Sequence, residues 1–182
     1  MNVDDAPAYG RVAKAFHWAI ALLIALMFAI GWTMDSENRD ADSINAVDIH
    51  MTLGVVIMVL VVLRFIWRLK NPPPPMPDHM SRFGCLTAQC GHAALYVLTF
   101  TIPAVGLSMS ILEGEGSLFF GLISLEPGPA ESEDAAELLG SLHKWLGWGF
   151  LAMFAGHLGA ALSHQYVIRD DVLSRMMPSI RS

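Results

Sequence analysis

Five of the seven histidines in this chain lie within long apolar stretches, where an ionisable side chain is unusual. An imidazole inside a membrane span costs free energy, so a histidine in such a place is first considered a functional residue. The candidates are His17, His50, His92, His143 and His157. The other two are His79, in a proline-rich segment, and His164, seven residues after His157.

Their positions along the apolar stretches predict two pairs. His143 and His157 are fourteen residues apart, which is close to four helical turns, so they share one helix face at a separation of about 21 Å. His50 matches the depth of His143, and His17 matches the depth of His157. We therefore expect His50 to face His143 on the outer side of a membrane, and His17 to face His157 on the inner side.

Two neutral imidazoles that face each other at matched depth are suitable ligands for a six-coordinate haem iron. The haem macrocycle is apolar and suits the interior of a helix bundle, whereas its propionates need water or cations. Arg64 and Arg68 could meet the inner propionates or could simply anchor the chain at the membrane surface, and Lys144 could serve the outer haem. The pattern predicts two non-covalent b haems, each with two histidine ligands.

Other chemistries fit the pattern less well. Zinc favours a tetrahedral cluster, often with cysteine, which histidines at two depths do not provide. A proton relay would combine histidines with carboxylates, but no Asp or Glu lies in the middle of a span. His92 could compete with His17 for the inner iron. We otherwise interpret His92 and His164 either as groups of a quinone site or as structural histidines near lipid headgroups.

The elements that would position these histidines are four apolar helices. The chain of 182 residues is 54% hydrophobic and only 15% charged, and its mean hydropathy is +0.47. A soluble core of this size could not bury so much apolar surface. The stretches long enough to cross a bilayer are residues 12–34, 44–69, 86–112 and 138–162. We expect one domain over residues 1–182, an all-α bundle of four transmembrane helices in membrane lipid.

The basic residues predict the orientation of this bundle. Of the eleven lysines and arginines, only Arg39 and Lys144 lie on the side of the first and third connections. The positive-inside rule therefore places both termini and the proline-rich segment in the cytoplasm. The net charge of −6 and the absence of a basic stripe argue against a nucleic-acid partner. A short amphipathic segment is expected at Leu118–Leu122, in the long third connection.

Several motifs together resemble a known family, the bacterial cytochrome b561 proteins, which are related to haem-bearing subunits of membrane hydrogenases. In chain order the motifs are FHW, DIHMTLG, VLRFIWRLKNPPPP, GHAALYVLTFTIPAVGLSM, LHKWLGW, GHLGAALSHQY and DDVLSRMMP. The resemblance covers nearly the whole chain. It implies a di-haem b protein of the bacterial inner membrane, with ligands on the first, second and fourth helices, which exchanges electrons with the quinone pool.

The expected function is therefore electron transfer between an outer redox partner and quinone. One branch of the family resembles a superoxide oxidase, which passes an electron from superoxide to ubiquinone. The acidic outer loops would not steer an anion such as superoxide, although Lys144 could act locally. The alternatives are this superoxide:ubiquinone oxidoreductase, a haem-bearing membrane anchor for a soluble redox partner, and a haem-free carrier or ion-binding bundle.

Overall fold

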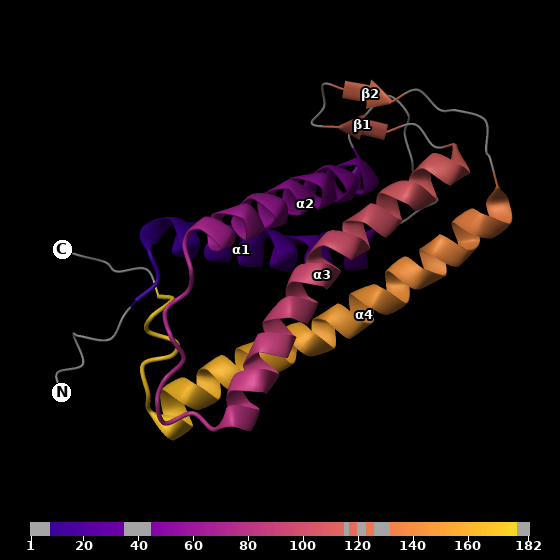
Figure 1. The fold of residues 1–182 in the computed structure, drawn as a ribbon. Coiled ribbons are helices and arrows are strands. Elements are labelled where there is room, and N and C mark those ends of the chain that lie inside the picture. Colours follow the sequence, from indigo (N-terminus) through magenta and orange to yellow (C-terminus); the bar gives the residue numbers. More distant parts are fainter. Residues whose placement is uncertain (1–7, 35–44, 115–116, 120–122, 126–131, 178–182) are drawn as a thin grey trace.

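Four long helices make up most of the chain (Figure 1). The computed structural model describes residues 8–34, 45–114, 117–119, 123–125 and 132–177. The helices are α1 (Arg11–Thr33), α2 (Ala46–Lys70), α3 (Arg82–Glu113) and α4 (Glu133–Ser163), and the π-helix η2 (His164–Ile168) continues α4. Each of the four is long and apolar enough to cross a membrane. The prediction of an all-α bundle with four membrane spans is confirmed.

Two short strands interrupt this helical pattern. β1 (Ser117–Phe119) pairs antiparallel with β2 (Ile123–Leu125). The amphipathic segment predicted at Leu118–Leu122 therefore begins within a strand, and its residues 120–122 lie outside the described part of the chain. β1 lies close to α2. We call this end of the bundle, shown in Figure 1, the hairpin end.

Polar caps explain why two helices begin earlier than predicted. The sequence predicted starts at Leu86 and Leu138, where the apolar runs begin. The Ser81 hydroxyl instead accepts a hydrogen bond from the Gly84 amide, and the Ser132 hydroxyl accepts one from the Ala135 amide. Each serine satisfies a backbone N–H that a helix start leaves unpaired. α3 and α4 thus extend beyond the apolar segments at these ends.

Backbone packing between helices follows the order of the chain. α1 packs against α2, α2 against α3, and α3 against α4, but among the described residues no Cα atom of α1 comes within 8 Å of one in α4. Side chains span this gap: the rings of Phe28 and Phe150 stack with their centres 6.1 Å apart. α1 and α4 are therefore spaced more widely than the other neighbouring helices, and their contact is made by side chains.

The opposite end of the bundle holds the two ends of the described chain. The Tyr9 amide donates to the Arg175 carbonyl at 3.2 Å, and Trp18 Nε1 donates to the Met176 carbonyl at 3.0 Å. Arg175 Nη1 also donates to the Pro75 carbonyl at 2.9 Å. These bonds join the N-terminal helix, the proline-rich segment and the C-terminal segment. We call this the terminal end, and residues 169–177 the C-terminal strap.

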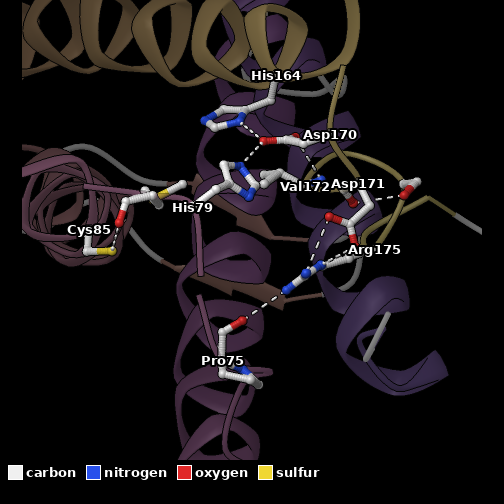
Figure 2. A network of polar contacts seen from close by, with 10 residues as sticks. Pro75, His79, Cys85, His164, Asp170, Asp171, Val172 and Arg175 are labelled. Atoms are coloured by element: carbon white, nitrogen blue, oxygen red, sulfur yellow. Dashed lines mark hydrogen bonds and ion pairs between the residues drawn. The ribbon is translucent and has the colours of Figure 1, made fainter. Parts of the chain in front are cut away.

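A carboxylate between two histidines fixes the strap (Figure 2). Asp170 Oδ2 accepts hydrogen bonds from His164 Nδ1 at 2.6 Å and from His79 Nε2 at 2.9 Å. Only 9% of the Asp170 side chain is exposed. The strap turns at Arg169, which has a left-handed φ of 61°, a conformation that costs a non-glycine residue some free energy. The Asp170 bonds compensate for that cost.

The Asp170 network has a predictable pH dependence. Burial alone would raise the pKa of Asp170, but hydrogen bonds from His164, the Val172 amide and His79 outweigh burial and hold the pKa below its ordinary value. A lowered carboxyl pKa stabilises the fold above the unfolded-state pKa of about 3.9 and loses that effect as pH falls through the folded-state pKa. The strap should therefore stay protected from neutral pH to about pH 5 and should open progressively as the pH falls below about 3.9 and through the lowered folded-state pKa.

We expect Asp170→Asn to loosen the strap at neutral pH, because the neutral amide loses the charge that both histidines contact. A hydrogen bond to a charged group contributes about 1.5–3 kcal/mol, so amide exchange of residues 169–177 should rise at least roughly tenfold. Hydrogen–deuterium exchange with mass spectrometry measures this directly. Asp78→Asn, at an exposed position of the same proline-rich segment, is the matched control. Equal exchange in the two variants would contradict the assignment.

Candidate functional site

The rings of His50 and His143 lie next to each other near the hairpin end. Their centres are 6.1 Å apart and their planes are inclined at 65°. His50 comes from α2 and His143 from α4, two helices with no Cα atoms within 8 Å of each other in the described residues. His143 Nδ1 donates to the Ile102 carbonyl at 3.0 Å. His50 Nδ1 is buried and has no hydrogen-bond partner in the described structure.

A cavity of about 480 Å³ surrounds this pair. Its volume lies in the range of cofactor sites in proteins. All four helices line it, and most of the lining is apolar. Lys144, beside His143, is the one charged residue of its lining within the described chain. The glycines that line it are Gly31, Gly54, Gly106 and Gly147. Glycines on four helices widen the space where the two imidazoles meet.

A second group of histidines lies near the terminal end. The ring centres of His17 and His157 are 6.3 Å apart, across the gap between α1 and α4. His92, from α3, also approaches His157, with a centre-to-centre distance of 5.3 Å. His157 therefore has two imidazole neighbours. Both expected pairs are close in space, while the ligand role of each histidine stays a prediction.

Two arginines stand beside the terminal-end histidines. Arg64 Nη2 lies 3.2 Å from His17 Nδ1, so the guanidinium donates to the ring nitrogen. A neutral His17 that accepts this bond carries its proton on Nε2. Ligation of a metal through Nε2 therefore requires Arg64 to release His17 and take another partner. The guanidinium carbons of Arg64 and Arg68 lie 5.3 Å and 5.8 Å from the ring centre of Tyr96.

In the described part of the chain, the two histidines predicted for a quinone site contact different partners. His92 contacts His157, whereas His164 lies in η2 and bonds Asp170. A site at the terminal end would therefore use one of them or would lie between them.

Sequence reasoning missed the aromatic residue between the histidine pairs. Phe150 lies seven residues after His143 and seven before His157, so all three share a face of α4. Its side chain is only 4% exposed and stacks on Phe28 and on Phe154. The regular spacing of seven could have identified it. Tyr96 was also missed. It is identified only by the structure, in which the guanidinium groups of Arg64 and Arg68 lie over its ring.

The donor set and the space fit haem. Two imidazoles that bind one metal from opposite sides, at about 2 Å for each metal–nitrogen bond, have ring centres roughly 6 Å apart. Both pairs match this separation. At the hairpin end the fit is supported further by the cavity and by the unpaired, buried His50 Nδ1.

Four membrane-spanning helices that bring histidines into facing positions define the class of membrane b-type cytochromes. A family model described as prokaryotic cytochrome b561 matches residues 8–179, and the chain belongs to this family. It is accordingly a multi-pass membrane protein that binds b-type haem and carries electrons across the membrane.

Several relatives match over nearly their whole length. The chain is 34% identical over 180 residues to cytochrome b561 homolog 2 of Escherichia coli, covering 97% of this chain and 95% of that one. It is 29% identical over 173 residues to a probable superoxide oxidase, CybB, of Yersinia pestis, covering 95% and 97%. It is 26% identical over 177 residues to cytochrome b562 of Cereibacter sphaeroides, covering 94% and 96%.

Proposed function

We propose that this protein transfers single electrons through two b haems, between a redox partner at the outer face and quinone at the inner face. The observation that carries the proposal is the presence of two histidine pairs with nearly equal ring separations, 6.1 Å and 6.3 Å. The fourteen-residue spacing on α4 puts the pairs at opposite depths. Haem supplies the one-electron chemistry when bound, and the protein supplies ligands, a dry environment and nearby charge.

His50 and His143 are the proposed ligands at the outer site, where Lys144 provides a cation. His17 and His157 are the proposed ligands at the inner site. There Arg64 and Arg68 provide positive charge for the propionates. Arg64 exchanges its bond to His17 Nδ1 for a propionate in this scheme, which frees His17 to ligate.

The terminal end is proposed to face the cytoplasm of a bacterial cell, in the inner membrane. The start of α1, the end of α2, the start of α3 and the strap carry eight of the eleven lysines and arginines, and hydrogen bonds join the first helix, the proline-rich segment and the strap at this one end of the bundle. These eight are Arg11, Lys14, Arg64, Arg68, Lys70, Arg82, Arg169 and Arg175. Such a concentration of positive charge favours the cytoplasmic side. The acidic connections then face outward.

Quinone is proposed to react near the terminal-end histidines. Reduction of a quinone to the quinol consumes two electrons and two protons, so the site needs groups that exchange protons with water. His92, beside His157, and His164, bonded to Asp170, are the imidazoles proposed for this role. His79, whose side chain is 53% exposed, connects Asp170 to solvent.

Superoxide is a second candidate for the outer donor. The relative from Yersinia pestis that is named a probable superoxide oxidase favours it. Lys144 in the cavity lining adds a local positive charge for a small anion. Two superoxide ions would each lose one electron and become dioxygen, and one quinone would take up both electrons with two protons.

Anaerobic reoxidation tests the quinone part of the proposal. Protein purified in detergent and reduced with stoichiometric dithionite should lose its reduced-haem absorbance when a short-chain ubiquinone is added. Reduced haem that persists in the presence of quinone would refute this acceptor. A parallel sample of oxidised protein receives superoxide from xanthine oxidase, with superoxide dismutase as the control. Haem reduction that the dismutase abolishes would establish superoxide as a donor, and no reduction would exclude it.

A further inference from the structure

α3 contacts the outer histidine pair although it carries neither histidine of that pair. The Ile102 carbonyl on α3 accepts the hydrogen bond from His143 Nδ1 at 3.0 Å. A neutral imidazole that donates from Nδ1 has its lone pair on Nε2. The bond to Ile102 therefore determines which nitrogen of His143 is free to bind a metal.

Gly106 makes this bond possible. It lies one turn after Ile102 on α3, and a Cβ atom placed there would lie 2.9 Å from His143 Cε1 and 3.0 Å from His143 Nδ1. Real Cβ atoms essentially never come so close to another heavy atom, so any larger residue would displace the imidazole. The His143 ring occupies the space that a side chain at residue 106 would fill.

His143 differs in this respect from the other paired histidines. His50 Nδ1 has no hydrogen-bond partner in the described structure, and His17 Nδ1 accepts from Arg64. Within the described residues, His143 is the one proposed ligand whose ring N–H donates to a backbone carbonyl. A backbone acceptor within a helix cannot rotate away as a side chain can.

We propose that α3 is the positioning element for the outer haem, with Gly106 and the Ile102 carbonyl holding His143 as the Nδ1–H tautomer so that Nε2 ligates. This inference rests on the proposed ligand role of His143. It assigns Gly106 a role through His143 rather than contact with iron. A hydrogen bond of this kind orients a ligand and raises its basicity, and its loss typically lowers metal affinity about 10–100-fold.

The predicted effect falls on one haem. In Gly106→Ala the methyl group pushes the imidazole off the Ile102 carbonyl, so the outer haem should bind about 10–100-fold more weakly. Where the outer haem is retained, its midpoint potential should rise, because a less basic ligand stabilises ferric iron less. The inner haem should keep its potential, and its retention also shows that the variant is folded.

Two glycine variants provide matched controls. Gly31→Ala places a methyl group on the wall of the same cavity, 3.6 Å from His50 Cε1, which is ordinary van der Waals contact. Gly147→Ala also adds a methyl group to the cavity wall and meets no atom within 4 Å. Both variants narrow the haem cavity without touching His143. A loss of outer haem in these controls as large as in Gly106→Ala would mean crowding of the cavity and would overturn the proposal.

The measurements are the haem-to-protein ratio, a redox titration, and the EPR signals of the ferric haems, made on holoprotein from all three glycine variants and His143→Ala. A selective change at the outer haem in Gly106→Ala supports the proposal. Unchanged haem content, potentials and EPR signals in Gly106→Ala would overturn it. Full haem content in His143→Ala would instead refute the ligand role itself, so the two failures are distinguishable.

A measurement on the wild-type holoprotein covers the case in which Gly106→Ala does not fold. The Nδ1–H proton of the His143 ligand should give a shifted proton NMR signal in the ferric protein. Because its acceptor is a helix carbonyl inside the bundle, this signal should exchange slowly with D₂O. Rapid loss of the signal would contradict the bond to Ile102 and overturn the proposal, whereas slow exchange would support it.

Discussion

Replacing His143 with alanine should remove the outer haem and leave the inner haem in place. The two rings of the outer pair come from α2 and α4, and within the described residues His143 is the one imidazole in ring contact with His50. The cavity would keep its apolar walls, but haem in it would have one protein ligand instead of two. Loss of a hydrogen bond to a metal ligand already lowers metal affinity about 10–100-fold. Loss of the ligand itself should therefore lower the affinity for the outer haem by more than about 100-fold.

A pyridine haemochrome assay on purified protein measures this loss. The haem content per chain should fall by about half, in line with loss of one of two sites. His79→Ala is the control, because His79 is an exposed histidine of the proline-rich segment, far along the bundle from the outer pair. Wild-type haem content in His143→Ala would mean that α4 does not ligate at this depth.

The inner site should depend on His17 and not on His92, although His92 lies closer to His157. The His17–His157 separation of 6.3 Å resembles the 6.1 Å of the outer pair and suits a metal ion between two rings. The His92–His157 separation of 5.3 Å is shorter than the roughly 6 Å that two metal–nitrogen bonds require. Moreover, the backbones of α3 and α4 pack closely, whereas in the described residues no Cα atom of α1 lies within 8 Å of one in α4.

In His17→Ala the affinity for the inner haem should therefore fall more than about 100-fold, whereas His92→Ala should keep both haems. Haem content and EPR spectra of the two variants decide the question, because loss of one axial ligand converts low-spin ferric haem to high-spin. His92→Ala should act on quinone kinetics instead. The reverse result, with haem lost only in His92→Ala, would reassign the inner ligand to α3.

Much of this architecture could be predicted from local patterns. Apolar runs of about twenty residues predict membrane helices because a helix of that length crosses the bilayer and satisfies all its backbone hydrogen bonds within itself. The spacing of His143 and His157 predicted their shared face because helical periodicity is nearly constant over four turns. The proximity of His50 to His143 followed from their matched depth, because both lie at a similar distance from the same face of the bilayer that their helices cross.

Other parts of the site depend on contacts that no local pattern encodes. The bond from His143 to the Ile102 carbonyl depends on the rotation of α3 about its own axis, which packing decides. The approach of His92 to His157 depends on the same rotation. The helix starts after Ser81 and Ser132 were missed because hydropathy identifies only where the apolar run begins. The first residue of a helix is determined instead by the side chain that caps its backbone amides. The Asp170 network joins residues 91 positions apart in the chain.

The wider spacing of α1 and α4 has a consequence for biogenesis. Among the described residues, close backbone packing joins each helix only to its neighbours in the chain, so successive helical hairpins can form in the order in which they are synthesised. The first and last helices meet through side chains, with Phe28 stacked on Phe150 and His17 beside His157. In the proposed scheme, haem held by these two histidines adds a further link between the first helix and the last. Maturation of the protein should therefore be coupled to the cell's supply of haem, because haem binding would add to the contact between α1 and α4.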